Sequence, residues 1–187
     1  MGSQTESDKA PRSELSRILK VRMLPADAVR IDADERERAA LAARFGIASV
    51  DALSAQVELE NCKKGVRAEG RLQARIMQTC AVSGDDFPVV IEEPIVLRFI
   101  EEGSADLAPS EDEDIDFDLT ADDCDEIEYA GDAFDLGEAV AQTLGLAIDP
   151  YAEGPDAENV RRAAGIVEEG SLGGALAEGL AALKRQN

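Results

Sequence analysis

The clearest pattern in this chain is an alternation of apolar and polar positions over residues 65–78. Val66, Leu72 and Ile76 mark one apolar face, and the other face carries mainly arginine, glutamate and glutamine. A period of two is typical of a β-strand with one face buried. Residues 56–60 alternate in the same way, and the turn-forming stretch 61–65 predicts a hairpin between the two runs.

Further strands are expected on both sides of this hairpin. Residues 89–100 are rich in β-forming side chains, and the sequence Glu-Glu-Pro at 92–94 predicts a bulge or a bend on an exposed edge. The three runs together predict an antiparallel meander. Shorter strands are expected within residues 15–24, at 29–31 and at 126–129.

One helix is expected after Asp32, which has Glu35 three residues later in an aspartate version of the capping box. Leu41 and Phe45 lie four residues apart on one face of it, and the alanines around them favour helix. Gly46 follows where a left-handed glycine ends many helices.

A second helix is expected after Asp135, with Glu138 completing the same capping pattern. Its buried stripe recurs every four residues, at Leu136, Val140 and Leu144. Pro150 closes this unit.

These elements predict an α+β fold: a twisted antiparallel β-sheet of about five or six strands with two main helices, an acidic loop and a partly helical C-terminal tail. Residues 1–13 are expected to form a disordered lead, and residues 14–151 a single domain that contains the acidic loop at 101–125. Residues 152–187 form the tail.

Charge is distributed very unevenly along the chain. The protein has 40 acidic and 19 basic residues, a formal net charge of −21. Residues 99–160 contain 21 of the acids and no lysine or arginine, so the rest of the chain, with 19 of each, is neutral. A concentrated negative field attracts basic proteins or cations and repels nucleic-acid phosphates.

The composition excludes several classes of chemistry. Without histidine there is no Ser-His-Asp or Cys-His catalytic arrangement and no histidine zinc site. Cys62, Cys80 and Cys124 are isolated, which argues against a disulfide framework and a structural zinc. We expect no catalytic residue, no metal and no cofactor.

The apolar runs of the chain are short. The sequence contains no run of about 18 apolar residues that could span a membrane, and residues 1–12 are polar and lack the apolar segment typical of a secretory signal. We therefore expect a cytoplasmic protein that makes no membrane contact.

Several stretches together resemble the bacterial YceD-like family, which is linked to accumulation of large-subunit ribosomal RNA, most closely its alphaproteobacterial branch. They cover about residues 13–151 in a consistent order, with a looser likeness at the C-terminus: Ser-Glu-Leu-Ser-Arg at 13–17, Ala-Ala-Leu-Ala-Ala-Arg-Phe-Gly at 39–46, Gly-Arg-Leu at 70–72, Gln-Thr-Cys at 78–80, Asp-Leu-Gly-Glu at 135–138, Ile-Asp-Pro-Tyr at 148–151 and Ala-Ala-Leu-Lys at 181–184. The positions that carry the resemblance include Cys80, Asp135, Leu136, Glu138 and Pro150.

The resemblance implies a non-enzymatic ribosome-biogenesis factor that supports large-subunit ribosomal RNA accumulation. Genes of the family often lie beside that of a small basic ribosomal protein, and no catalytic residues are established for it. Many members have a Cys-x-x-Cys pair where this chain has Cys80 followed by Ser83, so a thiol or metal role does not carry over. A lone Cys80 is either a small buried apolar residue or a thiol activated by nearby positive charge.

The concentrated negative charge of residues 99–160 implies a basic protein partner, and the resemblance implies that this partner is a ribosomal or RNA-processing protein. The candidate contacts are the acids of the expected loop: Glu111, Asp112, Glu113, Asp114, Asp116 and Asp118. Interleaved apolar residues give a segment that can order on a basic partner, whereas the alternative is a solubilising loop. A calcium loop is disfavoured because its sixth position holds Phe117 or Leu119 in place of glycine.

The alternative function is direct RNA binding through Arg67, Arg71 and Arg75, which share one strand face about 13 Å apart. The competing explanation is a solvated face paired across strands with Glu58 and Glu60. A third hypothesis, magnesium-dependent hydrolysis by paired carboxylates, has no acid pair on a strong structural signal.

Overall fold

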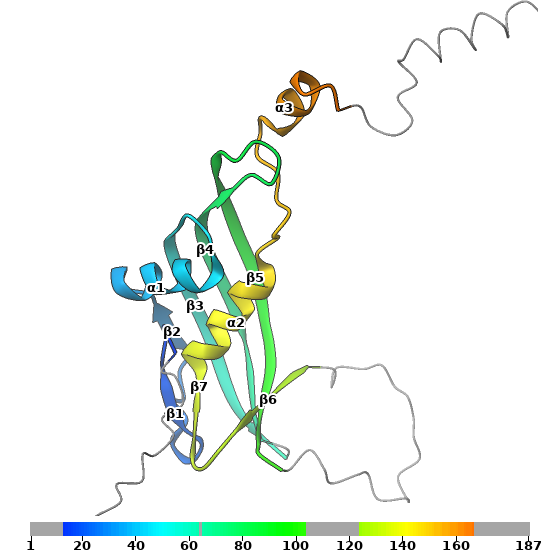
Figure 1. Cartoon of the computed structure of the whole chain (residues 1–187). Helices are drawn as coiled ribbons and strands as arrows, with labels where there is room; N and C mark the ends of the chain where they lie inside the picture. Colours follow the sequence, from blue (N-terminus) through cyan, green and yellow to red (C-terminus); the bar gives the residue numbers. More distant parts are fainter. Residues whose placement is uncertain (1–12, 64, 104–123, 167–187) are drawn as a thin grey trace, which may run out of the picture. The chain divides into compact units, whose positions relative to one another are not determined.

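The computed structural model describes residues 13–63, 65–103 and 124–166 (Figure 1). Their elements follow in the order β1 (Ile18–Lys20), the 3-10 helix η1 (Val21–Met23), β2 (Val29–Asp32), α1 (Glu35–Phe45), β3 (Ser49–Cys62), β4 (Gly65–Thr79), β5 (Asp86–Glu101), β6 (Asp125–Tyr129), β7 (Ala133–Asp135), α2 (Leu136–Ala147) and α3 (Ala157–Ala163).

The strands form a five-stranded sheet in the order β2-β3-β4-β5-β6 and a two-stranded antiparallel sheet of β1 and β7. The predicted α+β class, with a sheet and two main helices, is confirmed. The strands predicted for one sheet are divided between two, because β1 pairs with β7.

One pairing differs from the antiparallel arrangement predicted for the whole sheet. β6 runs parallel to β5, with Leu97 opposite Asp125 and Glu101 opposite Tyr129. Parallel neighbours need a connection of a dozen or more residues, and residues 102–124 provide one.

Strand lengths also differ from the sequence pattern. β3 begins at Ser49, well before the predicted run at 56–60, because its ladder with the long β4 continues from Cys62 opposite Gly65 back to Ser49 opposite Met77. β5 is one unbroken strand through Pro94. In the first expected strand only Ile18–Lys20 pairs, and the chain then turns into η1.

Helix α1 begins later than predicted. Its N-cap is Asp34, whose side chain accepts the N–H of Glu37 while the Glu37 carboxylate accepts the N–H of Asp34. Asp32 was the wrong choice because pairing with Ser54 keeps it in β2. Gly46 ends the helix in the left-handed conformation, with φ of 66°, as predicted.

Both main helices cover one face of the five-stranded sheet (Figure 1). Leu41 of α1 and the predicted α2 stripe are fully buried against core residues of β3, β4 and β5. Phe99 of β5 stacks on Phe134 of β7 with ring centroids 4.0 Å apart, which joins the small sheet to the same core.

The chain divides into two compact units. The first comprises the described residues up to Gln78 together with Pro88–Pro150, which include both sheets, α1 and α2. The second comprises Thr79–Phe87 and the described residues from Tyr151 onward. In it the Ala81 N–H donates to the Ala152 carbonyl at 3.1 Å.

No helix in the part of the chain that the structure describes is long and apolar enough to cross a bilayer. Residues 1–12 of the lead expected at 1–13, most of the acidic loop and the leucine-containing end of the tail lie outside the described residues.

Candidate functional site

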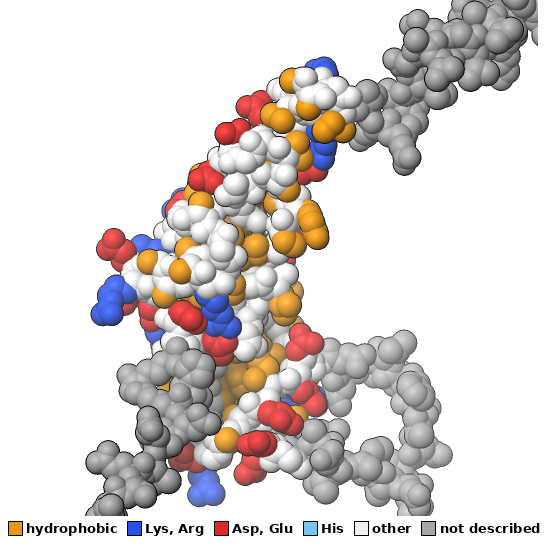
Figure 2. All heavy atoms as spheres, in the orientation of Figure 1, with side chains coloured by type: hydrophobic (Ala, Val, Ile, Leu, Met, Phe, Trp, Pro, Cys, Tyr) orange, Lys and Arg blue, Asp and Glu red, His pale blue; other side chains and the backbone are white. Residues whose placement is uncertain are grey.

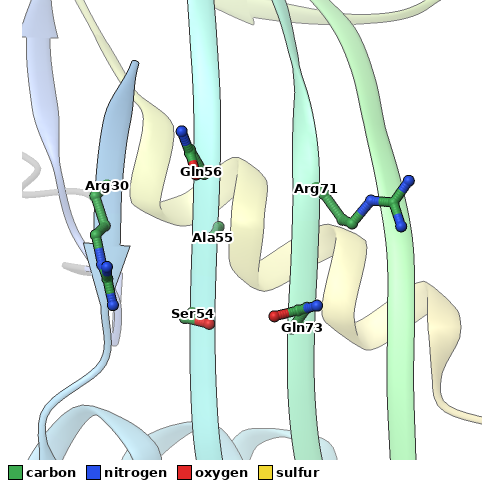
Figure 3. A pocket seen from close by; sticks show the side chains of 6 residues that line it. All are labelled: Arg30, Ser54, Ala55, Gln56, Arg71 and Gln73. Carbon is green, nitrogen blue, oxygen red and sulfur yellow. The ribbon is translucent and has the colours of Figure 1, made fainter. Parts of the chain in front are cut away.

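The sheet face opposite the helices carries a row of polar side chains. Arg30 on β2, Gln56 on β3 and Arg71 on β4 are cross-strand neighbours. Ser54 and Gln73 form the next row, and these side chains border a shallow depression of about 250 Å³ (Figure 3). All of them alternate with buried core residues, which keeps them on the solvent side.

The arginines of this face differ in their partners. The Arg30 guanidinium donates to Asp32 at 2.8 Å, and this bond holds the pKa of the Asp32 carboxyl below its usual range. Arg71 and Arg75 are exposed and have no carboxylate partner among the described residues. Their charges are therefore the ones available to an anion.

Arg67 lies in a different environment, although it shares the face of β4 with Arg71. Its Nε donates to Glu69 at 2.6 Å, and it stands opposite Glu60 in the ladder. Asp27 and Glu58 border a second depression, to which Arg67 also contributes. Arg67 is thus paired with Glu69 of its own strand, which differs from the cross-strand pairing with Glu58 and Glu60 in the competing explanation. Of the three candidate arginines, Arg71 and Arg75 are the ones without a carboxylate partner among the described residues.

A cluster of exposed carboxylates lies where β5 ends beside β6. We call it the acidic edge and define it as Glu101, Glu102, Asp125, Glu126 and Glu128. Figure 2 shows acidic side chains gathered over this part of the molecule. Glu126 pairs with Arg98 at 3.2 Å, whereas Glu102, Asp125 and Glu128 have no cationic partner within the described ranges.

The candidate partner-binding acids of the loop, from Glu111 to Asp118, and the calcium-like run among them lie outside the described residues. The acidic edge is therefore the described part of the strongly acidic zone that directly flanks them.

Glu138 is the centre of a polar network that joins three distant stretches of the chain. Its carboxylate accepts from Arg44 at 2.8 and 2.9 Å, and also from the Ser13 hydroxyl. Arg44 further pairs with Glu14 at 2.9 Å. The Arg44 guanidinium is the main reason that the pKa of Glu138 falls to about 2, and Ser13 and Gln142 lower it further.

Asp135 ties the N-terminal segment to the start of α2. Its carboxylate accepts the N–H of Gly137 at 3.0 Å, the N–H of Arg17 at 2.7 Å and the Ser16 hydroxyl at 2.6 Å. A Cβ on Gly137 would collide with the Leu15 carbonyl, so glycine permits this close approach.

The structure shows the surroundings of four of the positions that carry the resemblance. Asp135 caps a helix, Leu136 is fully buried and Glu138 anchors the network, whereas Pro150 lies exposed just after α2. Capping and packing account for the first three without a ligand.

Cys80 is buried, with 3% of its surface exposed. Its Sγ accepts the N–H groups of Val82 at 3.4 Å and Ser83 at 3.3 Å. Hydrogen bonds from the Ser83 side chain and backbone, and from the Gly154 backbone, lower the pKa of this thiol to about 7. The sequence argument considered a nearby positive charge, but the Ser83 side chain and backbone N–H groups supply the stabilisation.

Metal ligands are not brought together in the described ranges, where no group of three or more Asp, Glu or Cys side chains could hold an ion.

Sequence reasoning missed Arg30 and Arg44. Arg30 could have been found from its alternation with Val29 and Ile31, but the partner of Arg44 is 94 residues away.

Comparisons with protein-family models, with curated proteins and with solved structures find no match to this chain.

Proposed function

We propose that this chain is a non-enzymatic ribosome-biogenesis factor of the cytoplasm that supports large-subunit ribosomal RNA accumulation by binding a basic protein partner. The observation that carries the proposal is the acidic edge, whose Glu102, Asp125 and Glu128 have no cationic partner among the described residues. The resemblance to the YceD-like family supports the cellular context.

Charge favours a protein partner over RNA. Lysine and arginine side chains can form charge-assisted hydrogen bonds with exposed carboxylates, whereas phosphates are repelled by them. A ribosomal or RNA-processing protein supplies such side chains in number.

The test is affinity capture at physiological salt, with the recovered proteins identified by mass spectrometry after crosslinking. We expect a basic ribosomal or RNA-processing protein, lost when Glu102→Gln, Asp125→Asn and Glu128→Gln are combined. A matched variant, Asp27→Asn with Glu58→Gln and Glu60→Gln, removes three other exposed charges and should retain the partner. Neutralising residues 111–118 tests the adjoining acids in the same assay.

Cells that lack the protein should accumulate less large-subunit ribosomal RNA. The wild type and the matched variant should restore it, and the acidic-edge variant should not. Recovery of no basic protein, or equal recovery by both triple variants, contradicts the proposal.

A second candidate function is RNA binding by Arg71 and Arg75, favoured because both lack carboxylate partners in the described ranges. Gel shifts with ribosomal RNA fragments across a salt series test it, since phosphate contacts weaken as salt rises. Combined Arg71→Gln and Arg75→Gln should abolish the shift. Arg22→Gln with Arg36→Gln, equally exposed, is the control; no salt-dependent shift at all would exclude this candidate.

A further inference from the structure

One side of β5 is only partly covered. β5 spans Asp86–Glu101, but the ladder with β6 occupies only Leu97–Glu101. On that side no other strand of the described chain pairs with residues 90–96. We call residues 90–96 the open edge; an uncovered strand of this kind presents backbone groups to a further strand.

The direction of these backbone groups follows from the neighbouring ladder. The Glu102 N–H donates to the Tyr129 carbonyl of β6 at 2.9 Å. The backbone N–H and C=O groups of successive residues point to alternate sides of a strand, so even-numbered residues of β5 point to the same side as Glu102. The side chains of Ile91, Ile95, Leu97 and Phe99 all lie on the buried face, which shows that this alternation continues along β5. Val90, Glu92, Pro94 and Val96 therefore direct their backbone groups toward the open edge.

Pro94 agrees with this assignment because it has no N–H and is tolerated only where no ladder bond is needed. The open edge thus offers the N–H groups of Val90, Glu92 and Val96 and the carbonyls of Val90, Glu92 and Pro94.

Helix α2 lies alongside and completes a slot. A depression of about 350 Å³ is bordered by β5 residues 93–97 and by Thr143, Leu146 and Ala147 of α2. Leu146 is 85% exposed and Val96 is 46% exposed. A strand edge beside a helix is the arrangement in which an extended peptide adds its main chain to a sheet and places alternate side chains in the slot.

The charge of the slot indicates the chemistry of the occupant. Glu93 and Asp125 border it, and no lysine or arginine among the described residues does so. The acidic edge continues from Asp125 along β6. An extended segment that alternates apolar side chains with lysine or arginine would satisfy both the apolar wall and the carboxylates.

A second copy of this chain is a poor occupant by the same criterion. Antiparallel pairing of two open edges about their centres would place Glu93 of one copy directly opposite Glu93 of the other, and like charges directly opposite one another are destabilising.

We propose that the open edge of β5 binds an extended basic segment of the partner protein as an added β-strand, with apolar side chains against α2. The inference rests on the proposed function, because it identifies where and in what conformation the basic partner binds.

The probe is the peptide acetyl-Lys-Val-Lys-Val-Lys-Val-Lys-amide, with its Glu-for-Lys counterpart as the charge control. We expect the basic peptide to bind the full chain and to slow amide hydrogen exchange at Val90, Glu92 and Val96. The acidic peptide should not bind. Protection confined to other residues overturns the proposal.

Two matched variants separate main-chain pairing from charge. Glu92→Pro removes the charge and the N–H at the open edge, whereas Glu92→Gln removes only the charge. Glu92→Pro should weaken peptide binding about 10-fold, because it loses a main-chain hydrogen bond to the peptide. Glu92→Gln keeps that hydrogen bond and should weaken binding about 3-fold or less. If Glu92→Pro fails to fold, Leu146→Arg, which places a cation in the slot, should weaken binding about 10-fold. Unchanged binding in the folded variants overturns strand addition.

Exchange of the free protein tests the other occupants. Slow exchange of the three amides without peptide and at all protein concentrations means that the chain covers its own edge. Protection that rises with protein concentration means a second copy. Either result overturns the proposal.

The capture assay keeps the two proposals separate. If Glu92→Pro and Leu146→Arg recover the basic protein while the acidic-edge variant does not, the proposed function stands and strand addition is wrong. If no basic protein is recovered by the wild type, both are wrong.

Discussion

At the scale of single residues, the carboxylates of Asp135 and Glu138 show how one sequence pattern serves two purposes. The pattern Asp-x-x-Glu correctly predicts that Asp135 caps α2. It does not predict that Glu138 turns to Arg44 and Ser13, because neither is near it in sequence. A propensity argument covers local backbone bonds, whereas this contact depends on α1, α2 and the N-terminal segment meeting.

Replacing Glu138 with glutamine should lower the free energy of unfolding at pH 7 by about 1–3 kcal/mol, because it removes a half-buried charge-assisted network. Folding depresses the pKa of Glu138 from its ordinary 4.5 to about 2. The folded state therefore favours the carboxylate, and its contribution is complete above pH 4.5 and is lost as pH falls toward 2.

Urea unfolding at pH 7, 5 and 3 measures this dependence. The difference between wild type and Glu138→Gln should narrow as the pH falls below about 4.5. Glu58→Gln, an exposed acid without a partner in the described chain, should change stability by no more than about 0.5 kcal/mol. A difference that stays constant with pH would show that the network does not depend on the charge.

At the scale of elements, the strongest periodic signals predicted the right structures, and the weaker ones failed at their ends. β4 alternates over its whole length and was identified correctly. The first half of β3, with Ala52, Ser54 and Ala55 among small residues, has weak β-propensity and becomes strand because β4 pairs with it. The start of α1 was misplaced by the two overlapping Asp-x-x-Glu patterns, at Asp32 and at Asp34.

Asp34→Ala should lower the free energy of unfolding by about 1 kcal/mol, since it removes the side chain that caps α1. Asp32→Ala is the matched control, because it removes an exposed carboxylate whose partner among the described residues is the exposed Arg30, and it should leave the free energy of unfolding nearly unchanged. Chemical denaturation of both variants measures the difference. A larger loss of unfolding free energy in Asp32→Ala than in Asp34→Ala would show that Asp34 is not the N-cap of α1.

At the scale of the whole molecule, the net charge of −21 opposes its compact state through self-repulsion. Ion pairs such as Arg44 with Glu138 act in the opposite sense but are partly shielded from solvent. Salt should therefore screen the net repulsion more than the favourable pairs.

Raising the ionic strength from 0.01 to 0.15 M shortens the Debye length from about 30 to about 8 Å. The midpoint of thermal unfolding should rise by about 2–4 °C, equivalent to about 1 kcal/mol for a chain of this size. Near the isoelectric point of about 4.2 the same change in salt should give no increase. A lower midpoint in salt at pH 7 would show that the ion pairs outweigh the repulsion.

Neighbouring residues and composition specify the α+β class, the β3–β4 hairpin, the two helices and the concentration of negative charge, so each of these features follows from the sequence. Only the packing of the whole chain places β6 parallel to β5, joins Glu138 to Arg44 and leaves an open strand edge beside α2. These features arise from pairings between residues far apart in the chain, and no local propensity specifies which distant groups will meet.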